Sequence, residues 1–209
     1  ANQSKIPRLN KLMLAPFQLQ RSLIDKVEKT AQAAAQGVAS RIILKMNTLT
    51  DEKLMEALVH AGQAGVQIDL IIRGACMLPA QRPGVTDNIR VRSIIGRFLE
   101  HSRVFYFRTG NDESLYLSSA DWMNRNMLRR VELAWPVEDA ALRQRVIDEC
   151  LVAYLHDNVD AWSLNADGQY TRVQPAKPKR TSSKAVQAAT SVPPHGAQAA
   201  LMALHAAKS

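Results

Sequence analysis

The densest group of polar side chains in the sequence lies within residues 90–130. Arg97 precedes the tetrapeptide EHSR, in which His101 and Arg103 are two positions apart. Side chains alternate along an extended chain, so this imidazole and this guanidinium are expected on the same side. Arginine keeps its charge and can fork onto phosphate oxygens, while histidine can transfer a proton or attack as a nucleophile. The pair predicts phosphoryl chemistry on an anionic substrate; the alternative for His101 is a histidine that is merely hydrogen-bonded at a strand entrance.

A second polar block, SSADWMNRN, occupies residues 118–126, directly after a predicted strand. It holds hydroxyl, carboxylate and amide groups, which are suited to orienting an imidazole and a phosphate. Ser119 and Asp121 are therefore supporting candidates. Trp122 in the same block is expected to be a packing residue.

Further candidates stand at the ends of two predicted parallel strands. Arg73 ends the run over residues 66–72, at the sheet edge where α/β folds place ligands, and Gly74 lets a backbone approach closely. Lys45 and Asn47 end the preceding strand and could face the same cleft, or make an ordinary loop hydrogen bond. A surface guanidinium is the alternative for Arg73. The cysteines Cys76 and Cys150 lack the spacing of a zinc site, and no metal site is expected in this chain.

The apolar periodicity indicates which elements position these residues. A helix begins near Leu19 and is stopped by Gly37; a second helix is capped at Thr50 and ended by Gly62. A third helix is expected from about 138 to 156, and strands are expected over 41–45, 66–72, 89–95, 104–107, 114–118, 131–135 and 170–173. The first two strands and the helix between them form a β-α-β unit with parallel strands. The prediction is an α/β fold with a mixed β-sheet flanked by helices.

Composition and charge divide the 209 residues into three parts. From Arg172 to the C-terminus there are six Lys and Arg and no acid, so most of the formal charge of +8 belongs to the tail. We expect residues 1–14 to be an extended N-terminal segment of an excised fragment and 15–173 to be the folded domain. Residues 174–209 are expected to be a basic disordered tail with a marginal Ala-rich helix near 197–207. No apolar run approaches the roughly 18 residues that a membrane span needs.

Several segments together carry a family resemblance. A His-x-Arg triplet with a later Ser-Ser-Ala-Asp resembles the phospholipase D superfamily, although Arg108 stands where that motif places an aspartate. A more extensive likeness to the last domain of a bacterial polyphosphate kinase covers roughly residues 15–173. It is carried by ILKMNTL (43–49), GVQIDLIIRG (65–74), NIRVRSIIGRFLEHSRVFYF (88–107), SSADWMNRN (118–126) and RRVEL (129–133).

This resemblance implies reversible transfer of the terminal phosphate of ATP to inorganic polyphosphate, with Mg²⁺, through a phosphohistidine. In that family the phosphorylated histidine and the residues that bind magnesium lie in a preceding domain, so this chain would hold half an active site and be inactive alone. The fold implied is one phospholipase D-like half. His101 corresponds to the family's second mechanistic histidine, and Arg73 and His101 to residues that contact nucleotide and phosphate. Arg103 and Arg97 are expected to hold further phosphate oxygens.

The expected partners are ATP or ADP, inorganic polyphosphate, the preceding domains and, in the full-length enzyme, further copies of itself. Two reduced cysteines favour a cytoplasmic protein, with membrane association of the full-length enzyme left open. Two alternatives remain. One is a phosphodiesterase in which two copies pair around His101; the other is a non-catalytic polyanion-binding module that uses the basic tail with Arg90 and Arg92.

Overall fold

The computed structural model describes residues 9, 11–175 and 193–207. One nine-stranded sheet runs through it in the order β1-β7-β6-β5-β2-β3-β4-β8-β9. The strands are β1 (Met13–Ala15), β2 (Ser40–Met46), β3 (Gln67–Ile72), β4 (Ile89–Ile94), β5 (Val104–Thr109), β6 (Asp112–Ser118), β7 (Glu132–Pro136), β8 (Ala161–Leu164) and β9 (Tyr170–Arg172). β3 pairs in parallel with β2 and β4, and the remaining pairs are antiparallel. The predicted α/β class with a mixed sheet flanked by helices is confirmed.

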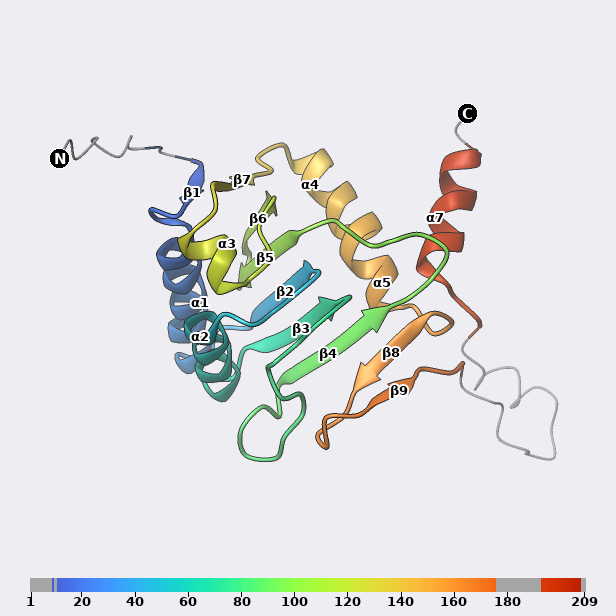
Figure 1. The fold of residues 1–209 in the computed structure, drawn as a ribbon, viewed down its shortest axis with the longest axis horizontal. Helices are drawn as coiled ribbons and strands as arrows, with labels where there is room; N and C mark the ends of the chain where they lie inside the picture. Colours follow the sequence, from blue (N-terminus) through green and yellow to red (C-terminus); the bar gives the residue numbers. More distant parts are fainter. Residues whose placement is uncertain (1–8, 10, 176–192, 208–209) are drawn as a thin grey trace.

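Helices cover both faces of the sheet (Figure 1). One face carries α1 (Leu19–Ala35) and α2 (Glu52–Gln63), with the short α3 (Asn124–Leu128) nearby. The other face carries one continuous rod made of α4 (Ala140–Val146), the π-helical turn η1 (Ile147–Val152) and α5 (Ala153–Leu155). α7 (Ala197–Ala206) packs beside α5.

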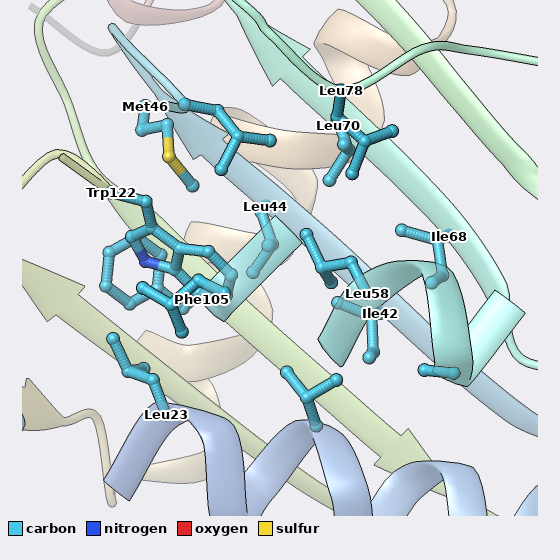
Figure 2. Close-up of a cluster of buried hydrophobic side chains, with 14 of the residues drawn as sticks. Leu23, Ile42, Leu44, Met46, Leu58, Ile68, Leu70, Leu78, Phe105 and Trp122 are labelled. Atoms are coloured by element: carbon cyan, nitrogen blue, oxygen red, sulfur yellow. The ribbon is translucent and has the colours of Figure 1, made fainter. Parts of the chain in front are cut away.

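The alternation of side chains in β2 explains the two layers. Ile42, Leu44 and Met46 belong to the larger core beneath α1 and α2, whereas Ile43 belongs to the core beneath η1 and α5. Figure 2 shows the larger core, in which Trp122 meets Phe105 edge to face with ring centroids 5.5 Å apart. Trp122 is fully buried, so its prediction as a packing residue is confirmed.

The structure differs from the predicted elements at three points. The N-cap of α2 is Asp51 rather than Thr50, because the Asp51 carboxylate accepts the Leu54 N–H at 3.1 Å. The helix predicted over 138–156 contains the π-helical turn η1. Strand β8 was not predicted, since four residues show no clear periodicity. Residues 13 and 14, at the end of the segment expected to be extended, belong to β1 and pair with β7.

The expectation of disorder over 174–209 does not describe the last part of the tail. The marginal helix near 197–207 is present as α7, and Ala197 at its start is fully buried. Asp157 Oδ2 accepts the Ala197 N–H at 2.7 Å, and Asn158 exchanges hydrogen bonds with His195. These anchors were missed because each lies far from the tail in sequence. Residues 176–192 lie outside the described part of the chain.

Candidate active site

The centre of the site is Asn47, the first residue after β2. Its side-chain Oδ1 accepts a hydrogen bond from Nε of Arg73 at 3.1 Å, and its Nδ2 lies 3.4 Å from Nδ1 of His101. Arg73 is the first residue after β3, which runs parallel to β2. Because parallel strands end at the same edge of a sheet, Asn47 and Arg73 lie side by side there. His101 reaches them from the loop between β4 and β5.

Asp121 fixes this arrangement from the other side. Its Oδ1 accepts the backbone N–H of Asn47 at 2.7 Å, while Arg103 donates from Nη2 to Oδ2 at 3.0 Å. Arg103 also donates from Nη1 to the carbonyl oxygen of His101 at 3.0 Å. Burial acts to raise the pKa of Asp121, but the hydrogen bonds from Arg103 and Asn47 outweigh it and hold that pKa below its usual range. The carboxylate is therefore ionised and ties the His101 loop to the end of β2.

Arg97 lines a surface hollow that it shares with Arg73. A pocket of ≈ 400 Å³ is lined by Arg73 and Arg97 together with the exposed apolar side chains Ile95, Phe98 and Leu99. The Arg97 guanidinium carbon lies 5.7 Å from the centre of the Phe98 ring. Two arginine side chains and an exposed apolar surface thus line the same hollow.

Lys45 does not stand at the open side of the site. Its side chain is 4% exposed, and its ammonium forms an ion pair with Glu100 at 2.8 Å and lies 3.3 Å from the centre of the Tyr154 ring. Burial lowers the pKa of Lys45, against the opposing effect of Glu100. The residue supports the His101 loop from beneath, on the sheet face opposite to α1 and α2.

Ser119 belongs to a separate hydrogen-bond network. Its hydroxyl pairs with the Glu132 carboxylate and accepts the backbone N–H of Leu133 at 3.1 Å. Glu132 also accepts from Asn126 Nδ2 at 2.6 Å. The network joins the two ends of the connection between β6 and β7, which contains α3, and is not linked by a described hydrogen bond to His101.

Three residues with structural roles around the site were missed by sequence reasoning. Glu100 is an acceptor for Lys45 and for Gln198, and Tyr154 lies against Lys45. Glu100 could have been identified from the sequence, because it is an acidic residue between Arg97 and Arg103. Tyr154 and Gln198 gave no signal, because only the fold brings them near.

Comparison with known proteins decides the family. Residues 12–184 match the family described as Polyphosphate kinase C-terminal domain 2. The chain belongs to this family. It is 54% identical to a polyphosphate kinase of Pseudomonas aeruginosa over 171 residues, which are 82% of this chain and 25% of that protein. It is 47% identical to a polyphosphate kinase of Paraburkholderia phytofirmans over 175 residues, 84% of this chain and 26% of that protein.

The fold of a solved polyphosphate kinase agrees. The crystal structure of polyphosphate kinase from Porphyromonas gingivalis superimposes with a TM-score of 0.84 at 33% identity, covering 97% of this chain and 29% of that one. The chain thus spans about a quarter of the length of the curated polyphosphate kinases it matches. Membership of this family favours the kinase reading over the phosphodiesterase and the polyanion-binding module. Among the described residues, no helix combines the length and apolar character that crossing a bilayer requires.

Proposed function

We propose that this domain supplies half of an active site that transfers the terminal phosphate of ATP reversibly to inorganic polyphosphate. The other half, with the histidine that becomes phosphorylated, would come from a preceding domain. The observation that carries the proposal is the contact of one side chain, Asn47, with both His101 and Arg73 at the end of two parallel strands. The polyphosphate kinase family of the chain supports it.

Each residue would then have a role in that reaction, and its contacts support that role. Arg73 and Arg97 line one hollow, where they would neutralise phosphate oxygens as charge develops during transfer. Since Asn47 Oδ1 accepts from Arg73, the group that faces His101 Nδ1 is the Nδ2 donor. Nδ1 then acts as acceptor, and neutral His101 carries its proton on Nε2. That N–H would donate a hydrogen bond to the departing nucleotide diphosphate while the bond between the γ-phosphorus and the bridging oxygen breaks and the bond from the γ-phosphorus to the histidine of the preceding domain forms.

The role proposed for Arg103 follows from its contacts with neighbouring residues of the chain. Its fork is bound to Asp121 and its third donor to the His101 carbonyl, so the residue holds the loop while its positive charge remains near the site. Asn47 and Asp121 orient the groups that touch substrate. Lys45 supports the loop from below, and Ser119 keeps the adjoining turn in place.

Mg²⁺ would be held by ATP phosphates and by the preceding domain. Within residues 9, 11–175 and 193–207, no group of three or more His, Cys, Asp or Glu side chains is arranged to bind a metal ion. We also propose that the full-length enzyme is a cytoplasmic homo-oligomer that uses ATP or ADP.

The experiment is a His101→Ala substitution in a full-length polyphosphate kinase that carries this domain. Polyphosphate formation from ATP should fall on the order of 10²–10³-fold, the usual cost of losing a group that stabilises transition-state charge. His60→Ala is the matched control, because His60 is exposed in the last turn of α2. Turnover near wild type in the His101 variant would exclude the role proposed for it.

A further inference from the structure

The loop that carries His101, residues 95–103 between β4 and β5, is neither helix nor strand. Within the described part of the chain, the backbone of residues 96–101 is hydrogen-bonded by two side chains. Arg103 donates to the His101 carbonyl, and Gln198 binds both backbone groups of Phe98. The position of the loop thus depends on a residue that lies about a hundred positions away, in α7.

Gln198 pairs with Phe98 as a neighbouring strand would. Its Oε1 accepts the Phe98 N–H at 2.8 Å, and its Nε2 donates to the Phe98 carbonyl at 2.8 Å. The side chain is buried, although it is a polar residue on a terminal helix. Gly96 leaves the space that Gln198 occupies, since a Cβ at position 96 would stand 2.6 Å from Gln198 Oε1.

Gln198 also reaches the residue next to His101. Its Nε2 donates to Glu100 Oε1 at 2.6 Å, and Glu100 Oε2 receives the buried Lys45 ammonium at 2.8 Å. Lys45 projects from β2, two residues before Asn47. Glu100 is therefore held between Gln198 on α7 and Lys45 on β2, and Asn47, which contacts His101, directly follows β2.

α7 is itself held in one place. Asp157 Oδ2 accepts the Ala197 N–H, while Asp157 Oδ1 accepts three backbone N–H groups of the turn before β8, from Val159, Asp160 and Ala161. Ala197 is fully buried in the core beneath η1 and α5. A helix fixed in this way can impose a position on the loop, whereas an exposed loop with few backbone hydrogen bonds has little capacity to fix itself.

We propose that Gln198 is a positioning residue: through Phe98 and Glu100 it sets the loop at the place from which His101 meets Asn47 and the phosphate. The proposal rests on the function proposed above. It assigns a role in that site to a residue C-terminal to the 12–184 segment that matches the family. Gln198 touches neither substrate nor His101, so it acts on turnover by holding the imidazole in place.

The test is Gln198→Met in the full-length enzyme, which keeps side-chain length and helix propensity but removes all three hydrogen bonds. We expect kcat to fall by about 10–100-fold with KM for ATP changed less than about threefold, since a displaced catalytic group costs turnover. In the 209-residue chain, hydrogen exchange at the Phe98 amide should become faster by more than the change in global stability, measured by urea unfolding, accounts for. Met202→Gln is the control, because Met202 is exposed on the same helix.

Gly96→Ala provides a second route to the same loss. The added methyl would stand 2.6 Å from Gln198 Oε1 and 3.1 Å from Asp160 Oδ2, so it would displace the Gln198 carboxamide while the sequence of α7 stays unchanged. The same fall in kcat and the same faster exchange at Phe98 are expected. This variant keeps the test valid if Gln198→Met does not fold.

Two results would overturn the proposal. One is normal kcat in either variant when Phe98 exchange is fast; the other is unchanged Phe98 exchange. These results differ from a failure of the proposed function, which would show itself as normal turnover in His101→Ala.

Discussion

The side-chain amide of Asn47 presents its donor nitrogen to Nδ1 of His101 at 3.4 Å. The orientation of this amide is set by Arg73, which donates to the oxygen at its other end. One amide therefore contacts both the His101 ring and the Arg73 guanidinium. A side chain at position 47 with two acceptor oxygens, in place of one donor and one acceptor, should change the contact with His101 and leave that with Arg73.

Asn47→Asp tests this relationship. A carboxylate still accepts from Arg73 but now also accepts from His101, so neutral His101 should shift its proton from Nε2 to Nδ1. We expect ¹⁵N NMR of the imidazole to show the changed tautomer and turnover of the full-length enzyme to fall by at least about tenfold. Asn111→Asp, in the exposed turn between β5 and β6, is the control. An unchanged tautomer would show that Asn47 does not orient the ring.

Asp121→Asn removes the charge that joins Arg103 to the end of β2. The free energy of unfolding near pH 7 should drop by about 2 kcal/mol, the order of a hydrogen bond to a charged group. Because the folded-state pKa of Asp121 lies below its unfolded value, its stabilisation is present above about pH 4 and is lost as pH falls further. Urea unfolding should therefore show wild type and variant converging at low pH. A constant difference across that window would contradict the ion-pair explanation.

Much of this arrangement was predictable from the sequence, for reasons that particular residues show. Strands β2 and β3 are apolar runs that end at Asn47 and Arg73, so their parallel pairing predicted that the two residues meet. His101, Arg103 and Asp121 were found because they stand in dense polar segments. Local sequence does not specify what lies under a loop, however, and Lys45 was expected near the cleft although it lies beneath Glu100. The contact of Gln198 with Phe98 spans a hundred positions and leaves no periodic trace.

The pair formed by Lys45 and Glu100 should behave as a unit. Lys45→Met leaves the Glu100 carboxylate without its cation in a largely buried place, which typically costs about 3–5 kcal/mol. Glu100→Gln in the same protein should recover part of that loss, since no uncompensated charge remains. The measurement is a double-mutant cycle by urea unfolding. Losses that add to within about 0.5 kcal/mol would show that the two side chains are not coupled.

Arg90 and Arg92 were candidates for polyanion binding, and the structure gives them unequal roles. Arg92 Nη1 donates to the carbonyls of Tyr154 and Leu155 at 3.0 and 2.6 Å, so it caps the C-terminal end of α5. Arg90 forms an ion pair with Asp69, and its side chain is 56% exposed. Arg92→Met should therefore lower the free energy of unfolding by about 1–3 kcal/mol and Arg90→Met by less than about 1 kcal/mol. Equal losses in urea unfolding would show that the cap contributes nothing beyond a surface charge.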